Sequence, residues 1–280
     1  MPFLERPGKP TLHYCIDDFT DPWKNRPYLL LQHGYSRSGK FWYNWVPYLS
    51  RFFKVVRPDL RGLGQSPLDF DPKQGYTVDG FLEDLVDLLD HIGIDKVHYC
   101  GESLGGMIGM GFAARHPDRV KTLTCVASGV WHNKFVTDTF SFGHPSWQEA
   151  LRKMGARGWS AAANSGMRFP PGTEQGLLDF YADEIGKSPL EAMIALSELA
   201  EVVDLSDALP GIKAPVLGIY PAGAKVADDE QMKRLQTQVA DFTLVRMKNS
   251  THTIMSLEGA ACAKTLLAFA ATHEGFSFVE

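Results

Sequence analysis

The chain has 280 residues, of which 44% are hydrophobic and 22% charged, and its formal net charge is −5. These values are typical of a globular protein, and the length is sufficient for one domain with a large core and an inserted subdomain. The acidic balance and the lack of a basic stripe argue against nucleic-acid binding. The sequence contains no run of 18 apolar residues that could cross a membrane. It also lacks the basic region followed by an apolar core that would suggest a secretory signal. We therefore expect a cytoplasmic protein without a membrane partner.

Four cysteines are widely scattered, and three of them lie within apolar runs: Cys15, Cys100, Cys125 and Cys262. Such cysteines behave as small buried hydrophobic residues. The pattern predicts reduced thiols, as expected in the cytoplasm, and not a disulfide framework.

The first part of the chain alternates strands and helices. Residues 11–16 predict a short edge strand, and residues 28–32 form the continuous apolar run of a strand buried on both faces of a parallel sheet. The remaining expected elements are an aromatic helix over 41–49, a strand over 52–57, an amphipathic helix over 77–92, a strand over 97–100, a helix over 107–114 and a strand over 120–126. Thr77 is placed to cap the helix that begins there.

The pattern changes between residues 131 and 208, where no strand run occurs. Helices are expected there over 147–154, 174–185 and 189–203. The alternation then resumes with strands over 215–220 and 242–247 and helices over 229–239 and 257–270. Strands and helices that alternate at short spacing form a mostly parallel sheet flanked by helices, here with an inserted helical segment.

The sequence Gly-Glu-Ser-Leu-Gly at residues 101–105 stands between a predicted strand and a predicted helix. Gly-x-Ser-x-Gly in that context is a nucleophile elbow, a tight turn that exposes the serine hydroxyl above the sheet. The pattern therefore predicts Ser103 as a nucleophile. The spacing of the glycines does not fit a dinucleotide-binding loop, and no lysine follows as in a phosphate-binding loop. We expect neither a cofactor nor a metal.

A serine hydroxyl is a weak nucleophile at neutral pH and needs a base within hydrogen-bond reach. His252 is the best placed of the nine histidines, because its loop follows the last strand and so lies at the same sheet edge as the elbow. His33, at the end of an earlier strand, is expected to shape its loop. Acyl transfer also needs donors to the developing oxyanion. The backbone N–H groups of Leu104 and Tyr35 are predicted to form this oxyanion hole.

Residues 28–39, the loop 58–66, the elbow, and the last two strands with His252 together resemble the α/β-hydrolase fold superfamily. The elbow and the helical insertion are similar to those of small hydrolases grouped with 3-oxoadipate enol-lactonases and related carboxylesterases. The resemblance implies an α/β-hydrolase core over residues 1–130 and 209–280, with a helical cap inserted at 131–208. It also implies that Ser103 is the nucleophile and His252 the general base.

The chain departs from this resemblance at the acid of the catalytic triad. The family pattern places that acid after the strand before the last one, where this chain has Ala224, and no carboxylate follows the strand at 120–126. Asp228 and Asp229 are the nearest substitutes, although either could simply cap the next helix. A weakened dyad, or an acid from elsewhere in the chain, is the alternative. Loss of the acid lowers turnover by about 10⁴-fold in the serine proteases.

The leading hypothesis is a serine hydrolase that cleaves a carboxylic ester or lactone through an acyl-enzyme. Arg37 could bind an anionic group of the substrate or could be a solvated loop residue. Trp131 and Phe135 suggest an apolar or aromatic small-molecule substrate, although such residues could instead hold the cap on the core. We expect a monomer or a homodimer.

Two other readings stay open. One is hydrolysis of a carbon–carbon bond in a diketone or ring-cleavage product at the same site. The other is a ligand-binding or sensor protein that retains a hydrolase site. Epoxide hydrolysis and dehalogenation are disfavoured, because those reactions need a carboxylate nucleophile and position 103 is serine.

Overall fold

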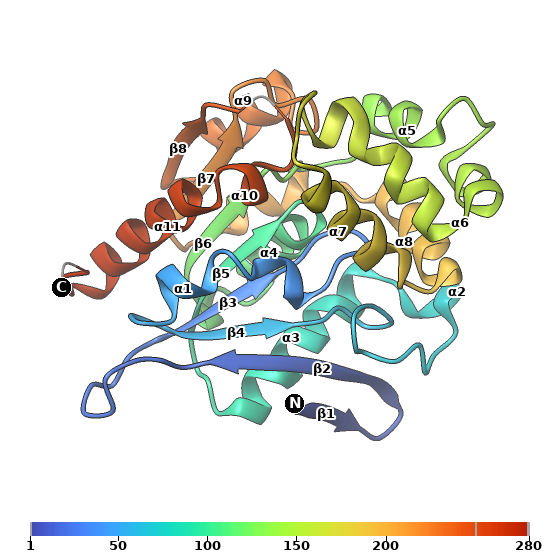
Figure 1. Ribbon diagram of the computed structural model, residues 1–280. Coiled ribbons are helices and arrows are strands. Elements are labelled where there is room, and N and C mark those ends of the chain that lie inside the picture. Colours follow the sequence, from blue (N-terminus) through green and yellow to red (C-terminus); the bar gives the residue numbers. More distant parts are fainter. Residues whose placement is uncertain (1, 250, 279–280) are drawn as a thin grey trace.

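The computed structural model describes residues 2–249 and 251–278. Their strands form one sheet in the spatial order β1-β2-β4-β3-β5-β6-β7-β8 (Figure 1). Strand β2 pairs antiparallel with both β1 and β4, and the other neighbours pair parallel. The strands are β1 (Phe3–Arg6), β2 (Lys9–Asp17), β3 (Tyr28–Gln32), β4 (Lys54–Pro58), β5 (Val97–Glu102), β6 (Val120–Val126), β7 (Val216–Pro221) and β8 (Phe242–Met247). The predicted mostly parallel sheet is confirmed.

Helices cover both faces of this sheet. They are α1 (Val46–Leu49), α2 (Pro72–Gly75), α3 (Val78–Ile92), α4 (Leu104–Arg115), α5 (Lys134–Ser141), α6 (Trp147–Ala163), α7 (Gln175–Gly186), α8 (Leu190–Val202), α9 (Asp229–Gln238), α10 (Ile254–Leu257) and α11 (Gly259–Glu274). Successive side chains of β3 alternate between two cores. Leu30 packs into the core with α3, α4 and α9, whereas Leu29 and Leu31 pack into the core with α1 and α11. A strand buried on both faces needs the continuous apolar run seen in its sequence.

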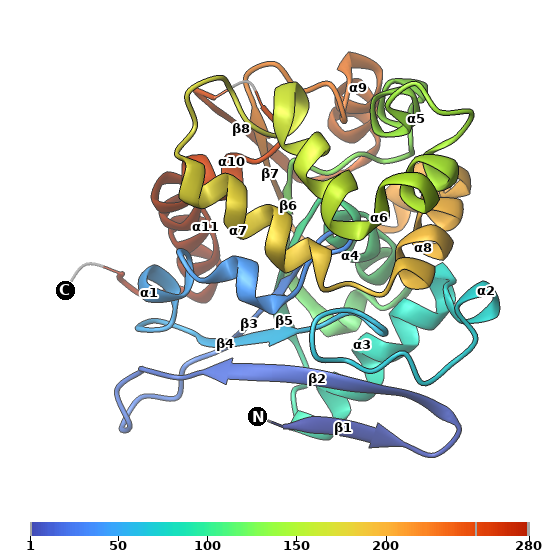
Figure 2. The same cartoon turned by 45° about the vertical axis from the view of Figure 1, so that its right-hand side comes forward.

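Helices α5 to α8 connect β6 to β7 and replace the simple crossover of a parallel sheet. Figure 2 shows them as one group, with α5, α6 and α8 on the right and α7 crossing the middle of the view. The helices predicted in this segment are present as α6, α7 and α8. Among the residues that the structure describes, no helix is both long and apolar enough to cross a membrane.

Several local features differ from the sequence-based expectation. The strand β1 and the helices α2 and α5 are not predicted, because each is short. The aromatic segment 41–49 is not one helix: a 3₁₀ turn over Gly39–Trp42 is followed by the short α1, which has Pro47 in its first turn. Proline lacks the N–H that a continuous helix would use there. Thr77 caps α3 as predicted, because its hydroxyl accepts a 2.9 Å hydrogen bond from the Gly80 N–H.

Parallel strands end at a common edge, and ligands of open α/β sheets bind outside this edge. The loops after β3, β5, β6, β7 and β8 all emerge there, because these strands are parallel neighbours. The elbow and the loop of His252 follow β5 and β8 respectively. The topology therefore brings both segments to one edge of the sheet.

Candidate active site

Ser103 stands at the junction of β5 and α4 with a backbone conformation that side chains rarely adopt, φ 52° and ψ −120°. Only close packing can hold a serine in this region. The glycines of the elbow permit that packing: a Cβ on Gly101 would lie 2.2 Å from the Gly105 carbonyl oxygen, and a Cβ on Gly105 would lie 2.4 Å from the Gln32 carbonyl oxygen. The strain at Ser103 is thus imposed by the contact of α4 with the strand ends.

The two predicted oxyanion donors lie beside Ser103. Leu104 is the first residue of α4, so its N–H has no partner within the helix. Tyr35 lies in the loop after β3, and its N–H makes no hydrogen bond to the residues that the structure describes. Both residues line a small cavity of about 50 Å³ together with Ser103 and His252. The helix N-terminus also favours negative charge at this position.

His252 is held by the segment between α6 and α7. Its backbone N–H donates to the Met167 carbonyl oxygen at 2.9 Å, and the adjacent Thr253 hydroxyl donates to the Arg168 carbonyl oxygen. Burial, together with the positive charges of Arg37 and Arg168, lowers the pKa of His252 to about 3. The imidazole is therefore neutral at physiological pH and able to accept a proton.

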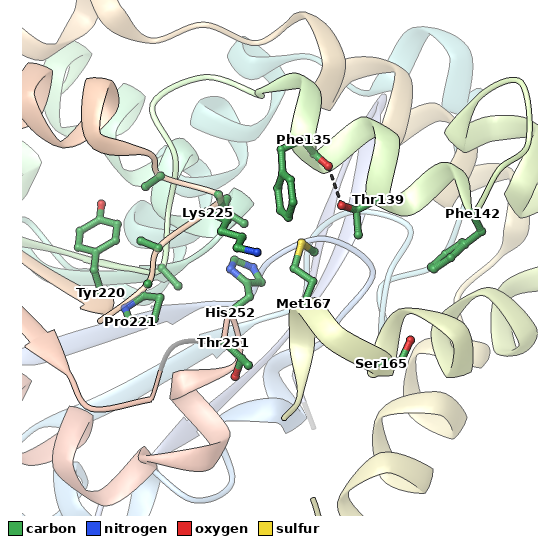
Figure 3. Close-up of a pocket in the computed structure, with 15 residues that line it drawn as sticks. Phe135, Thr139, Phe142, Ser165, Met167, Tyr220, Pro221, Lys225, Thr251 and His252 are labelled. Atoms are coloured by element: carbon green, nitrogen blue, oxygen red, sulfur yellow. Dashed lines mark hydrogen bonds between the residues drawn. The ribbon is translucent and has the colours of Figure 1, made fainter. Parts of the chain in front are cut away.

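Ser103 and His252 line the same cavity, although no direct hydrogen bond joins them in the described part of the chain. Such bonds are often long or poorly aligned without substrate. A second, larger cavity of about 560 Å³ adjoins the small one, since His252, Met167 and Val226 line both. Figure 3 shows the His252 ring at the wall of the larger cavity.

A buried ionic cluster lies behind His252. Glu102, the residue before the nucleophile, is fully buried, and its carboxylate forms an ion pair with Arg37. Its Oε1 lies 3.5 Å from the His252 Nε2. Burial raises the pKa of Glu102, and the adjacent Arg37 opposes this rise.

Arg168 adds a second positive charge to this cluster. Its side chain is 3% exposed, donates to the Ser160 hydroxyl at 3.3 Å, and lies over the rings of Phe140 and Trp159. Burial, together with the charge of Arg37, lowers the pKa of Arg168 to about 9. These two guanidinium groups add to the effect of burial, which is the main reason why His252 resists protonation.

The structure does not bring the predicted acid to His252. Asp228 caps α9: it accepts from the Gln231 N–H at 3.1 Å and from the Asn133 side-chain amide at 3.2 Å. Asp229 is in the first turn of the same helix. Within the described residues, Glu102 is the carboxylate that comes within 4 Å of a His252 ring nitrogen. Ala224, at the usual position of the acid, lines the larger cavity.

The three residues predicted to bind substrate lie in different places. Trp131 lines the small cavity beside Ser103, and Phe135 lines the larger one (Figure 3). Arg37 is buried and paired with Glu102, so it is not a solvated loop residue, and it lines neither of these two cavities. His33 shapes its loop as expected, since its Nε2 accepts from the Leu60 N–H at 2.9 Å.

Sequence reasoning missed two charged residues of the site, Glu102 and Arg168. Glu102 lies inside the elbow motif at a position where the motif specifies no residue type. A charged side chain in a strand flanked by apolar residues is a signal of a paired buried group. Arg168 lies in a short π-helical turn over Asn164–Arg168, which no periodic pattern marks. No three His, Cys, Asp or Glu side chains in the described ranges gather closely enough to hold a metal ion.

Comparison with known families decides the fold family. A family model described as the alpha/beta hydrolase fold matches residues 27–191, more than half of the chain. The chain belongs to the α/β-hydrolase fold family. Both the predicted fold and the predicted resemblance to this superfamily are thereby confirmed.

Solved members of the α/β-hydrolase fold family align along nearly the whole chain. The enol-lactonase from Burkholderia xenovorans LB400 is 26% identical, with 96% of this chain and 100% of that chain covered and a TM-score of 0.81. A carboxylesterase structure from Nitrososphaera gargenis is 20% identical, with coverages of 98% and 99% and a TM-score of 0.83. The second likeness, at its low identity, shows the fold alone.

A relative with higher local identity covers less of the chain. A candidate carbamate hydrolase (RutD) from Caulobacter vibrioides is 35% identical over 115 residues, which is 41% of each chain. The matched segment thus spans about two fifths of that relative's length. The match adds a relative whose name indicates a candidate carbamate hydrolase.

Proposed function

We propose that this protein is a serine hydrolase that cleaves a carboxylic ester or lactone of a small apolar or aromatic molecule. The observation that carries the proposal is the strained Ser103, which shares one cavity with His252 and with the two backbone donors. A strained backbone at an exposed nucleophile is common where the strain serves the chemistry. The enol-lactonase among the similar structures, which is 26% identical to this chain, supports this class of substrate.

The reaction follows from these positions. The Ser103 oxygen attacks the substrate carbonyl carbon while His252 takes the hydroxyl proton. The N–H groups of Leu104 and Tyr35 bind the oxyanion as the tetrahedral intermediate forms. His252 then gives its proton to the leaving oxygen, and the carbon–oxygen bond breaks to leave an acyl-enzyme. Water, deprotonated by His252, attacks the acyl carbon and releases the carboxylic acid and Ser103.

The sizes of the two cavities indicate where the parts of the substrate would lie. The cavity beside Ser103, at about 50 Å³, is too small for most of a drug-sized molecule. The adjoining cavity, at about 560 Å³, is in the range of small-molecule sites. Its lining includes Phe135, Phe142 and Met167. We infer that the bulk of the substrate occupies the larger cavity and that only the scissile carbonyl enters the small one.

Helices α5 to α8 act in this proposal as a cap over the sheet edge, a unit that covers residues 131–208. Phe140, Trp147 and Met167 from this segment line the small cavity. The Tyr35 hydroxyl donates to the Met193 carbonyl oxygen of α8 at 2.6 Å, which ties the oxyanion loop to the cap. The cap thus excludes water from the nucleophile and supplies most of the apolar wall.

Rapid mixing with p-nitrophenyl acetate tests the proposal. We expect a burst of p-nitrophenolate close to one equivalent per chain, followed by slower turnover, because acylation of Ser103 precedes hydrolysis of the acyl-enzyme. The Ser103→Ala variant should show no burst. A wild-type protein that turns over no short ester would contradict ester hydrolysis. That result would favour either carbon–carbon bond hydrolysis or ligand binding without catalysis. Addition of a diketone separates these two alternatives: cleavage of the diketone indicates hydrolysis, and binding without cleavage indicates a binding protein.

A further inference from the structure

The proposed mechanism leaves open which group orients His252. A neutral imidazole can carry its proton on either ring nitrogen, and only one tautomer presents the correct lone pair to the serine. Neutralising the acid that fixes this tautomer costs about 10⁴-fold in the serine proteases. The loop after β7 supplies no such acid here, since Ala224 occupies the expected position and Asp228 is engaged as a helix cap.

Glu102 has the position that the missing acid would need. Its Oε1 lies 3.5 Å from the His252 Nε2, and both groups are buried, with Glu102 fully so. The separation is longer than a hydrogen bond, but catalytic contacts commonly tighten when substrate binds. Glu102 also precedes Ser103 directly, so the elbow fixes the nucleophile and this carboxylate together.

We propose that Glu102 is the acid that positions His252, in place of a carboxylate in the loop after β7. This inference rests on the proposed function. Glu102 accepts a hydrogen bond from the facing ring nitrogen, which leaves the other ring nitrogen unprotonated and ready to take the Ser103 proton. When the imidazole becomes positively charged in the transition state, the carboxylate stabilises that charge. Glu102 acts through His252 and touches no reacting atom, so it is a positioning residue.

The surroundings hold this carboxylate in place and oppose its protonation. Burial alone would favour the protonated acid, but the ion pair with Arg37 stabilises the charged form. Gly34 leaves the space that the carboxylate fills, because a Cβ there would lie 2.5 Å from the Glu102 Oε2. The absence of a side chain at position 34 therefore follows from the presence of Glu102.

The charges around His252 show why an acid is needed. The ionisable side chains that act on the imidazole are Glu102, Arg37 and Arg168, and Lys225 lines the cavity that His252 borders. The two arginines disfavour the imidazolium that must form during acyl transfer. With Glu102 neutralised, the two arginines would act on the imidazolium unopposed. The carboxylate must therefore stabilise the imidazolium against more positive charge here than in a site without buried cations.

The Glu102→Gln variant tests the inference, since it keeps the shape of the side chain and removes its charge. We expect kcat for p-nitrophenyl acetate to fall by roughly 100-fold or more, with KM changed little, because the acid acts in the transition state. We expect Glu102→Asp to retain part of the activity. Asp228→Asn is the competing variant, and it should keep kcat within about threefold, since its cap makes no contact with the site.

A normal kcat in Glu102→Gln, or a large loss in Asp228→Asn alone, would overturn the inference. A second measurement does not depend on the stability of Glu102→Gln. In the Ser103→Ala protein labelled with ¹⁵N-histidine and saturated with p-nitrophenyl acetate, the ring N–H of His252 that is hydrogen-bonded to the carboxylate should give a downfield proton resonance. Absence of this hydrogen-bonded resonance in the substrate-bound protein would also overturn the inference.

These outcomes separate the inference from the proposed function. Absence of ester turnover in the wild-type protein would mean that the proposed function fails. Normal wild-type turnover with an unaffected Glu102→Gln variant would mean that only the assignment of Glu102 fails.

Discussion

Tyr35 has two parts with separable roles. Tyr35 lines the cavity of Ser103, and its backbone N–H is the proposed oxyanion donor, whereas its hydroxyl donates to the Met193 carbonyl oxygen at 2.6 Å. Its ring packs on Trp147 with 4.7 Å between the centroids. If the oxyanion donor is the backbone, the hydroxyl contributes to stability and to the placement of the cap but not to the chemistry.

The Tyr35→Phe variant separates these roles. We expect the free energy of unfolding to fall by about 1 kcal/mol, because one buried hydrogen bond is lost. We expect kcat to change far less than the roughly 100-fold loss caused by removal of an oxyanion donor. Denaturant unfolding and ester turnover measure the two effects. A loss of 100-fold in kcat with unchanged stability would mean that the hydroxyl takes part in the reaction.

Among the individual residues of the site, the sequence reveals Ser103 and His252 as candidates but not Glu102. The first two follow from a motif and from a position after the last strand, and both depend only on the order of elements. The position of a carboxylate relative to His252 depends on how two loops fold in space, with Gly34 and Arg37 as further conditions. Arg37 illustrates the same limit, since its burial and its ion pair cannot be read from the chain.

Among the elements, α4 shows how a helix fixes the site. This helix contains several glycines, and two of them meet different surroundings. A Cβ on Gly105 would lie 2.4 Å from the Gln32 carbonyl oxygen, whereas the nearest atom to a Cβ on Gly111 would be 3.7 Å away. The first glycine allows α4 to approach the end of β3, and the second has no such function.

A matched pair of variants tests this difference. Gly105→Ala should lower the free energy of unfolding by about 1–3 kcal/mol, because backbone must move to admit the methyl group. It should also reduce ester turnover, since the elbow shifts with the helix. Gly111→Ala should leave turnover unchanged and raise stability by up to about 1 kcal/mol through better helix propensity. Urea unfolding measures both changes, and equal effects of the two variants would contradict the close-approach argument.

Elements with a strong periodic pattern are predictable, and short ones are not. The amphipathic α3 is found within a residue of its predicted start, and its cap Thr77 is confirmed. The helix α5 and the 3₁₀ turn at Gly39–Trp42 are stabilised by tertiary packing, so their sequences carry little signal. This matters for the site, because α5 supplies Phe135 and Phe140 to the cavity walls.

For the whole molecule, the alternation of strands and helices suffices to predict the sheet, and the family match confirms the fold. The order β4-β3-β5-β6-β7-β8 then brings the elbow and His252 to one edge. What the chain does at that edge depends on Ser103 acting as a nucleophile. Every other assignment in the account, from the oxyanion hole to Glu102, depends on this claim.

Reaction with a fluorophosphonate, followed by intact-protein mass spectrometry and peptide mapping, tests this claim most directly. A fluorophosphonate forms a covalent adduct only with a serine that its surroundings activate. We expect one adduct per chain, located on Ser103, and none in the Ser103→Ala variant. A folded wild-type protein that forms no adduct, or forms it at another residue, would show that Ser103 is not the activated nucleophile.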